Sequence, residues 1–577
     1  MHLKFNEIKS DLYNLKEAVK FVYRSDRKLF KGRIFLILFQ STLPLALLYL
    51  LKLLVDVITG IAAKTGGYGI NDIWLYAGLF CGVFLLTKLS DILKQLNDDI
   101  SFQKLMDYMS VLIQKKSTEL DLAFYDNPEY HDAFHRAREE VNYRPVQILN
   151  NLTGIISSSI SLASITIMLI AFSSFVIAVM IIAVLPSFFL KISVHKKLYE
   201  FRKENTHLYR KAGYFFDLMV KREYAKELRV YNLADYFRKS YADLREKIVS
   251  SVSKISISRS KLNLISAVVE AAVLIGIIVM LGNDVIAGAV TVGSFVMFFE
   301  AFRRGQGYMQ GIVSGVSGLY ENKLFLGNLF EFLKLEPVIK SAENPQRFPE
   351  VLEKGIKFEY VSFCYPGSEK RMIVENLSFE AKSGEIFKIK GENGSGKTTL
   401  MKLLCRLYDC TKGAIFIEGI DIRDFDLKEL RKNIGVIFQD FAKYDFTARE
   451  NIVLGNTDDD LSTGKLEDAS RLSCAEPVIE KLPSGYETML GKYFENGEEL
   501  SMGQWQRIAI ARALYTDAPI LILDEPTSFI DAEAENKFYE NLELLKKDKI
   551  IFVISHSVNT GMENGISYSI ESYKSSK

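Results

Sequence analysis

The sequence lacks the features of a polyanion-binding protein and of a disulfide-stabilised protein. Its 72 Lys and Arg residues are balanced by 71 Asp and Glu residues, so the formal net charge is only +1. This balance gives no electrostatic signal for a nucleic-acid partner. The five cysteines form no Cys-x-x-Cys pair and no cluster with histidine. We therefore expect buried or inert thiols rather than a zinc site or a disulfide framework.

A cleavable signal peptide is not expected either, because the N-terminal 33 residues are polar and charged and the first apolar run is too long. At 577 residues the chain needs more than one domain. Its hydrophobic content of 48% is concentrated in the first 335 residues, and the remainder has the composition of a soluble domain. We predict a transmembrane domain over residues 1–335, a proline-containing linker over 336–352 and a second domain over 353–577.

Six apolar segments in the first domain are long enough to cross about 30 Å of hydrocarbon, which takes roughly 20 residues. They are predicted at residues 34–58, 73–89, 146–172, 175–192, 262–281 and 285–302. Between the last two we expect a turn at 282–284. Residues 192–261 have helical periodicity, which predicts that the spans continue as helices beyond the membrane, with a separate soluble insertion as the alternative.

The connecting segments predict the orientation of these spans. The N-terminal 33 residues and the segments 88–145 and 192–261 are rich in Lys and Arg, whereas the short turns carry one lysine between them. Cationic segments remain in the cytoplasm. Both termini are therefore expected to be cytoplasmic, in what we interpret as a bacterial inner (plasma) membrane protein in contact with the lipid bilayer.

A phosphate-binding loop is predicted in the second domain. The short strand 386–389 runs into Gly391-Glu392-Asn393-Gly394-Ser395-Gly396-Lys397-Thr398, and a helix follows from Thr399. Glycines let backbone N–H groups converge on phosphate oxygens, and the start of a helix adds positive potential. Lys397 is expected to contact the β- and γ-phosphates of ATP, and the Thr398 hydroxyl to bind Mg²⁺.

Two carboxylates follow a second apolar strand, at Ile520-Leu521-Ile522-Leu523-Asp524-Glu525. Asp524 is expected to hold Mg²⁺ through water, and Glu525 to polarise the attacking water. The alternative is a strand that ends in a solvated acidic turn, which the neighbouring phosphate loop disfavours.

These motifs resemble those of ATP-binding cassette transporters, specifically exporter-type half-transporters that fuse six spans to one nucleotide-binding domain. Leu500-Ser501-Met502-Gly503-Gln504 resembles the family signature LSGGQ. Further positions match the glutamine loop, the D-loop, the switch histidine and the aromatic that stacks on adenine, namely Gln439, Asp531, His556 and Tyr365. The fold class implied is an α-helical six-span transmembrane domain plus an α/β P-loop ATPase domain.

The resemblance also implies a shared site, in which two domains face each other head to tail and enclose two ATP molecules. Ser501, Gly503 and Gln504 of one copy would meet the phosphate loop of the other. Glu525, His556 and Gln439 are then the catalytic residues, and Thr398, Gln439 and Asp524 hold Mg²⁺. The remaining ATP-binding residues are Tyr365, Gly391, Asn393, Gly394, Ser395, Gly396, Lys397, Thr398, Thr399 and Asp531.

The signature departs from the family pattern at Met502, which replaces its first glycine. A long side chain there could be tolerated or could slow the site that it completes. A second copy of the chain is the expected partner, and an impaired site would favour the alternative, a heterodimer of unequal sites. Segments 124–130 and 225–231 resemble those before or within the helices that rest on the ATPase domains, although they could merely cap extended helices.

The function implied is export of a peptide, lipid or drug-like substrate by alternating access. ATP would have to favour the closed state by roughly 5.5 kcal/mol more than the open one to invert a 1:99 population. An importer or an ATP-gated channel on the same scaffold remains an alternative. The substrate is not specified by the sequence, although Glu270 and Glu300 lie inside predicted spans, where carboxylates are costly and often functional. Each could receive a cationic group or pair with Arg303, Arg304 or Lys52.

Overall fold

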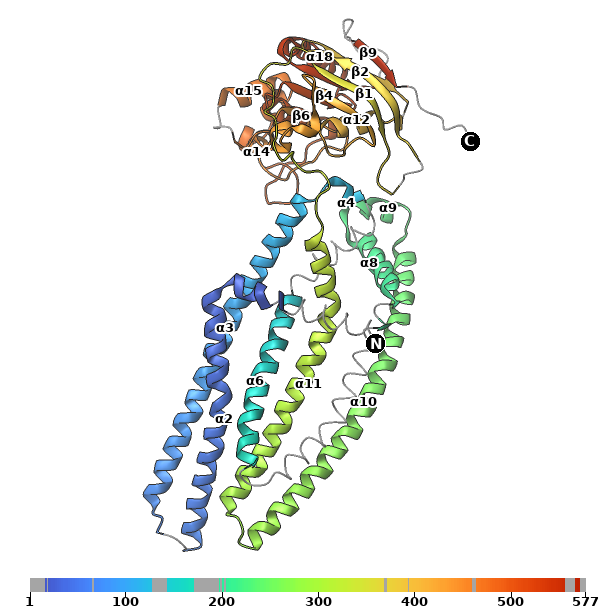
Figure 1. Cartoon of the computed structure of the whole chain (residues 1–577). Coiled ribbons are helices and arrows are strands. Elements are labelled where there is room, and N and C mark those ends of the chain that lie inside the picture. Colours follow the sequence, from blue (N-terminus) through green and yellow to red (C-terminus); the bar gives the residue numbers. More distant parts are fainter. Residues whose placement is uncertain are drawn as a thin grey trace. The chain divides into compact units, whose positions relative to one another are not determined.

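The computed structural model describes residues 16–17, 19–64, 67–126, 143–170, 197, 200–201, 204–367, 371–392, 394–458, 463–555 and 566–570. The chain divides into two compact units (Figure 1). Unit 1 comprises residues 1–118 and 133–334, and unit 2 comprises residues 119–132 and 335–577. The sequence had grouped residues 119–132 with the first domain. Of these residues, Leu122 and Ala123 of helix α4 (Leu122–Asp126) pack against the core of unit 2.

Unit 1 is helical throughout the part that is described. Its helices are α2 (Arg27–Ala62), α3 (Ile70–Glu119), α6 (Arg144–Ile170), α8 (Thr206–Val220), η1 (Arg222–Tyr224), α9 (Ala225–Val230), α10 (Ala234–Ile286) and α11 (Val292–Lys334). Asp26 begins α2 by accepting hydrogen bonds from the backbone N–H groups of Lys28 and Leu29. Helix α11 packs mainly against α6 and α2. Its Gly311 and Gly315 lie where a Cβ would meet Ser158 and Ile155 of α6, so these glycines allow close helix packing.

Four of the described helices are long and apolar enough to cross a membrane, namely α2, α3, α6 and α10. They contain the predicted spans 34–58, 73–89 and 262–281, and the described part of 146–172. The predicted span 175–192 lies outside the described residues. Helix α11 is not among the four, because Glu300, Arg303 and Arg304 interrupt its apolar residues.

The turn predicted at 282–284 is wrong, and so is the start of the sixth span at residue 285. Helix α10 continues to Ile286, and the chain reverses over residues 287–291. Gly288 has a φ of +71°, a left-handed conformation that ends a helix at little steric cost. Thr291 then begins α11, since its hydroxyl accepts a hydrogen bond from the Ser294 N–H at 3.1 Å.

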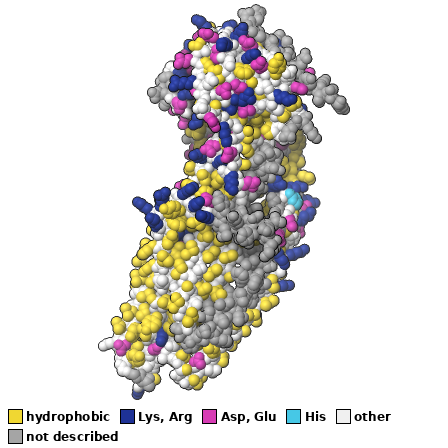
Figure 2. Space-filling view, viewed as in Figure 1, with side chains coloured by type: hydrophobic (Ala, Val, Ile, Leu, Met, Phe, Trp, Pro, Cys, Tyr) yellow, Lys and Arg dark blue, Asp and Glu magenta, His cyan; other side chains and the backbone are white. Residues whose placement is uncertain are grey.

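The surfaces of the two units differ. On the face shown in Figure 2, hydrophobic side chains cover much of the described surface of unit 1, whereas acidic and basic side chains are interspersed over unit 2. Trp74 in α3 is 75% exposed and Leu264 in α10 is 67% exposed. Exposed apolar side chains on long apolar helices indicate a lipid-facing surface.

Unit 2 contains two sheets. A four-stranded antiparallel sheet has the order β2-β1-β4-β5, and a five-stranded parallel sheet has the order β6-β7-β8-β3-β9. The strands are β1 (Ile356–Phe363), β2 (Val374–Ala381), β3 (Ile386–Gly391), β4 (Lys412–Ile417), β5 (Ile420–Asp421), β6 (Ile434–Ile437), β7 (Ile520–Asp524), β8 (Ile550–Ile554) and β9 (Ile566–Ile570). Every residue of β7 and β8 is buried, as expected for central parallel strands.

Helices and short turns surround these sheets. They are α12 (Lys397–Leu404), η2 (Ile422–Asp424), α13 (Leu427–Lys432), α14 (Ala448–Val453), α15 (Thr463–Leu472), α16 (Glu476–Ile479), η3 (Gly485–Glu487), α17 (Met502–Tyr515), α18 (Ala532–Leu545) and η4 (Lys546–Asp548). The predicted linker packs on this unit, since Phe348 and Leu352 are buried in its core. The described residues have the predicted architecture, a helical domain plus an α/β domain with a parallel sheet.

Candidate nucleotide site

The phosphate loop lies where β3 ends and α12 begins. Strand β3 runs between β8 and β9, one strand in from the edge of the parallel sheet. Gly394 and Gly396 have φ values of +80° and +93°, which favour glycine. A Cβ on Gly396 would also lie 3.1 Å from the Ile373 carbonyl oxygen. These glycines let the loop turn sharply into α12, although Asn393 lies outside the described residues.

Lys397 is folded back over this loop. Its Nζ donates hydrogen bonds to the carbonyl oxygens of Gly391 at 2.8 Å and Glu392 at 2.9 Å. Burial lowers the pKa of Lys397, an effect that the nearby Glu525 and Asp524 carboxylates oppose. The Ser395 hydroxyl is buried without a hydrogen-bond partner among the described residues. A buried ammonium and an unpartnered hydroxyl beside a glycine loop fit a phosphate ligand.

The first predicted carboxylate, Asp524, meets the phosphate loop directly. Asp524 ends β7 and is 1% exposed. The Thr398 hydroxyl donates to its Oδ2 at 2.6 Å. Burial raises the pKa of Asp524, and the Thr398 hydrogen bond opposes that rise. The hydroxyl and carboxylate predicted to hold Mg²⁺ are therefore neighbours, from residues 126 positions apart.

Glu525 follows in a left-handed conformation, with a φ of +51°. This φ is rare for a residue with a Cβ and is found at functional sites, where the surrounding structure maintains it. Gln439 Nε2 and Ser528 Oγ each donate to Glu525 Oε2 at 3.0 Å. The backbone is held as well, because the Glu525 N–H donates to the Ile554 carbonyl at 2.9 Å. The carboxylate is thus oriented by two side chains beside Asp524.

Tyr365 packs against the side of the phosphate-loop helix. Its hydroxyl lies 3.0 Å from the Thr399 hydroxyl, and Lys402 Nζ is 6.0 Å from the centre of its ring. The rings of Phe363 and Tyr408 meet it edge-on at 5.0 and 5.3 Å. The aromatic position predicted for adenine is therefore next to α12.

The signature residues form a second cluster at the start of α17. Ser501 caps this helix, and its N–H donates to the Gln504 side-chain oxygen at 2.8 Å in a capping box. A Cβ on Gly503 would lie 2.2 Å from the Phe529 carbonyl oxygen. Met502 is the first residue of α17 and is 43% exposed. The described hydrogen bonds of this cluster stay within unit 2 near residues 529–531 and do not include the phosphate loop.

Asp531 belongs to this second cluster. It caps α18 by accepting a hydrogen bond from the Ala534 N–H at 3.0 Å, and it forms an ion pair with Arg507. His556 lies outside the described residues. The structure thus gathers Lys397, Thr398, Asp524, Glu525 and Gln439 at one place and Ser501, Gly503, Gln504 and Asp531 at another.

Gln506 connects the two clusters, and sequence reasoning assigned it no role. Its side chain is 2% exposed, donates to the Glu525 carbonyl at 2.8 Å and accepts from the Phe529 N–H at 3.1 Å. The amide of one α17 residue therefore fixes the backbone on both sides of Ser528. Its position two residues after the signature is the only signal that could have identified it.

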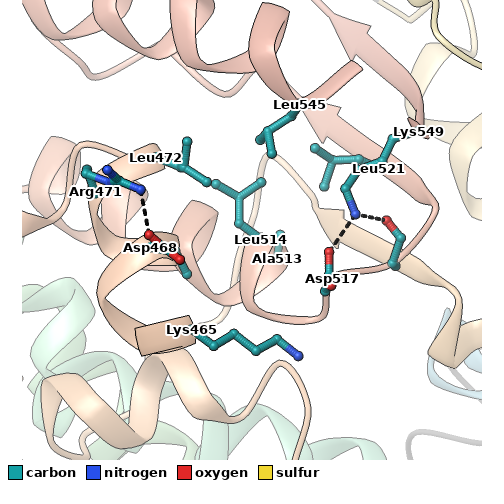
Figure 3. Close-up of a pocket in the computed structure, with 12 residues that line it drawn as sticks. Lys465, Asp468, Arg471, Leu472, Ala513, Leu514, Asp517, Leu521, Leu545 and Lys549 are labelled. Atoms are coloured by element: carbon teal, nitrogen blue, oxygen red, sulfur yellow. Dashed lines mark hydrogen bonds and ion pairs between the residues drawn. The ribbon is translucent and has the colours of Figure 1, made fainter. Parts of the chain in front are cut away.

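A separate cavity of about 280 Å³ in unit 2 contains none of these residues (Figure 3). Apolar side chains line it, among them Leu472, Leu514 and Leu521. At its rim, Lys549 donates to Asp517 at 2.8 Å. The nucleotide site is thus distinct from this cavity.

With this geometry established, comparisons with known proteins identify the class. A family model described as ABC transporter matches residues 374–528, which include the phosphate loop, Gln439, the signature and both strand-end carboxylates. The subtilin transport ATP-binding protein SpaT of Bacillus subtilis is 30% identical over 562 residues, or 96% of this chain and 89% of that protein. The chain belongs to the ABC transporter family, and it is an ATP-hydrolysing subunit of an ATP-driven membrane exporter.

Other relatives fall into two groups, according to how much of the chain they match. The nisin transport ATP-binding protein NisT of Lactococcus lactis subsp. lactis is 28% identical over 95% of this chain and 90% of that protein. The ATP-dependent lipid A-core flippase of Vibrio parahaemolyticus is 33% identical over 57% of this chain and 55% of that protein. A solved structure of a bacterial Atm1-family ABC exporter with ATP bound shares the fold, with a TM-score of 0.76 over 95% of this chain and 94% of that one at 22% identity.

Proposed function

We propose that this exporter subunit transports a peptide out of the cytoplasm. The observation that carries this proposal is the extent of the two matches to proteins named for subtilin and nisin transport, which include both units. The flippase and multidrug matches span only 48–58% of the chain. Because cargo is bound by the membrane domain, similarity along the whole chain is more informative about cargo than similarity over about half of it.

We propose that residues 1–335 form the transmembrane domain, residues 336–352 the linker and residues 353–577 the nucleotide-binding domain. Both termini are then cytoplasmic in a plasma membrane, as the distribution of Lys and Arg indicates.

ATP is proposed to bind with its phosphates over the loop 391–398 and its adenine against Tyr365. Lys397 would exchange its two backbone carbonyl partners for phosphate oxygens, whose negative charge compensates the positive charge of the buried ammonium. Thr398 and Asp524 fit Mg²⁺, which in nucleotide sites takes one or two protein oxygens besides phosphates and water. When bound, Mg²⁺ would neutralise charge on the phosphates.

Glu525 is proposed as the base that polarises the attacking water. Its carboxylate is held by Gln439 and Ser528, so its orientation is set before the water arrives. His556 is proposed to assist at the γ-phosphate, a role that rests on its place in the family pattern alone.

We propose that the site is completed by a second subunit. The cluster at Ser501, Gly503 and Gln504 has its N–H groups at the start of a 14-residue helix, where an anion is stabilised. Since the phosphate loop of the same chain has its own donors, this second cluster would serve the partner's ATP. A second copy of the chain is the proposed partner, and a related half-transporter with unequal sites is the alternative that Met502 supports.

The test is ATP hydrolysis by the purified chain in lipid nanodiscs, with and without peptide. We expect hydrolysis by the chain alone, stimulation by peptides, and loss of hydrolysis on Ser501→Ala combined with Gly503→Ala. Hydrolysis that persists undiminished in that double variant would contradict the shared site. Activity only after addition of a related half-transporter would establish the heterodimer. Stimulation by lipids or drug-like compounds but not by peptides would contradict the proposed cargo.

A further inference from the structure

A carboxylate and an amide meet between two long helices of unit 1. Glu270 on α10 accepts hydrogen bonds from the Gln310 Nε2 on α11, at 3.2 and 3.3 Å to its two oxygens. The other acidic residue of this region, Glu300, instead pairs with Arg303 at 3.0 Å on its own helix. Lys52 does not appear among the described ion pairs of either carboxylate. The sequence had left both carboxylates with the same open alternatives. Glu300 pairs with Arg303 and Arg304 of its own helix. The contacts of Glu270 include the Gln310 amide.

The Glu270–Gln310 pair lies near the end of the hydrocarbon core that is far from the turn between α10 and α11. Sixteen residues separate Glu270 from Ile286 at the end of α10, or about 24 Å along the helix. Eighteen residues separate Gln310 from Val292 at the start of α11, or about 27 Å. Both positions fall within the approximately 30 Å of a hydrocarbon core that starts at the turn between the helices. Carboxylates at such depths are costly and mark functional positions.

Two further polar side chains lie one helical turn from this pair. Ser266 precedes Glu270 by four residues, and Gln306 precedes Gln310 by four, so each shares a helix face with its neighbour. Ser266 is 5% exposed and Gln306 is 9% exposed. Ser266 Oγ and Gln306 Nε2 have no hydrogen-bond partner among the described residues. Buried polar atoms without partners are rare, and in a membrane span they cost more than in water.

The same helix faces become apolar toward the turn. Ile277 and Leu281 of α10, seven and eleven residues after Glu270, are buried in a cluster with Phe298 and Phe302 of α11. Phe302 precedes Gln306 by one helical turn and is fully buried. The polar residues thus form a short track along the α10–α11 contact, with an apolar cluster between the track and the turn.

We propose that Ser266, Glu270, Gln306 and Gln310 form a recognition site for a cationic segment of a peptide. Glu270 accepts the hydrogen bonds of a Lys or Arg side chain, with Gln310 as its positioning residue. The Gln306 amide and the Ser266 hydroxyl supply donors for backbone carbonyls of the same segment. A peptide offers both a basic group and carbonyl acceptors within a few ångströms, which matches a carboxylate flanked by donors. This site deepens the proposed function and rests on it.

The test compares two blocked pentapeptides that differ in one amine. The probes are acetyl-Ala-Leu-Lys-Leu-Ala-amide and the same peptide with norleucine in place of lysine. Binding to the full chain is measured in phosphatidylcholine nanodiscs, whose headgroups contain no primary amine. We expect the wild-type chain to bind the lysine peptide at least about tenfold more tightly, and Glu270→Gln to lose this preference. Glu270→Asp should keep most of it.

Glu300→Gln is the matched control, because Glu300 has its cationic partners on its own helix, and we expect it to retain the tenfold preference. Gln306→Leu keeps the side-chain size but removes the amide. It should weaken both peptides about equally, and it remains informative if Glu270→Gln does not fold. An unchanged preference in Glu270→Gln, equal affinities in Gln306→Leu and wild type, or no saturable binding of the lysine peptide would each overturn the site.

ATP hydrolysis in the same nanodiscs separates failure of this site from failure of the proposed function. Normal hydrolysis that is stimulated by peptides, without any lysine preference, would leave a peptide exporter that has no cationic site here. Absence of hydrolysis in the wild-type chain would contradict the proposed function whatever the binding result.

Discussion

The two units use buried polar residues in different ways. In unit 2 many buried polar groups of the proposed nucleotide site are paired, as Thr398 is with Asp524 and Gln506 with two backbone groups, although the Ser395 hydroxyl has no partner among the described residues. In unit 1 the track on α10 and α11 contains two buried polar atoms that lack partners among the described residues. A reaction common to a whole family favours a preformed network, whereas a cargo site must leave hydrogen-bonding capacity for a ligand.

A second contrast lies within unit 2. The proposed catalytic cluster is built from the ends of parallel strands, where Asp524, Glu525 and the loop after β3 converge. The signature cluster is built from the start of α17 and the segment 529–531. Gln506 links the two clusters within one chain. In the proposed ATP site, the catalytic cluster of one subunit would meet the signature cluster of its partner.

The largest expected effect is on the rate of ATP hydrolysis, when the Glu525 carboxylate alone is replaced and the rest of the network is kept. Glu525→Gln keeps the size and the hydrogen-bonding capacity of the side chain but removes the base. We expect the rate of ATP hydrolysis to fall by about 10²- to 10⁴-fold, and ATP to hold the two subunits together. The measurement is phosphate release in nanodiscs, with the exposed Glu540→Gln as control. A rate near that of the control would remove Glu525 from the catalytic role.

The next prediction tests whether Gly503 must be a glycine because of steric contacts within its own chain. A methyl group on Gly503 would clash with the Phe529 carbonyl, so Gly503→Ala should shift the segment that carries Asp531. We expect a loss of about 1–3 kcal/mol in stability. The measurement is thermal unfolding of unit 2 within the full chain. Gly464→Ala is the matched control, because a Cβ there meets nothing within 4 Å. Equal melting temperatures in the two variants would contradict the steric requirement.

The sequence predicted which residues lie together at the strand ends better than it predicted the connections around them. Lys397, Thr398, Asp524 and Glu525 could be identified because the chemistry restricts residue types at strand ends, and strands are recognisable from apolar runs. Gln506 could not, since its partners at Glu525 and Phe529 depend on how α17 packs against the end of β7. The turn near residue 288 was misplaced because Asn283 and Asp284, common turn residues, remain in the last turn of α10.

Replacing a buried amide should lower the free energy of unfolding by an amount of the same order as the glycine substitution. Gln506→Leu preserves volume and leaves the Glu525 carbonyl and the Phe529 N–H without their side-chain partner. Each such group costs about 1–3 kcal/mol if it remains dry, and less if water reaches it. We expect lower thermal stability together with a slower hydrolysis rate at saturating ATP. A variant that loses stability but hydrolyses ATP at the wild-type rate would show that Gln506 does not position Glu525.

The smallest effect concerns a contact made by α4. Tyr408 is 3% exposed, and its hydroxyl donates to the Asp126 carboxylate at the end of this helix. Burial and the Asp126 charge both raise the pKa of Tyr408, so the hydroxyl stays protonated and remains a donor. Because Asp126 is exposed and can be hydrated, Tyr408→Phe should cost only about 1 kcal/mol.

A double-mutant cycle of Tyr408→Phe with Asp126→Ala isolates this contact. The coupling energy from thermal unfolding should be close to the cost of the single Tyr408→Phe change, since Leu122, Ala123 and the Asp121 side chain contact the unit independently of Tyr408. If α4 also transmits closure of the ATPase domains, the same variants should reduce peptide stimulation of hydrolysis more than basal hydrolysis. If the two substitutions are additive in stability and peptide stimulation of hydrolysis is unchanged, the Tyr408 hydroxyl contributes nothing to holding α4. Tyr408 would then act through apolar packing alone.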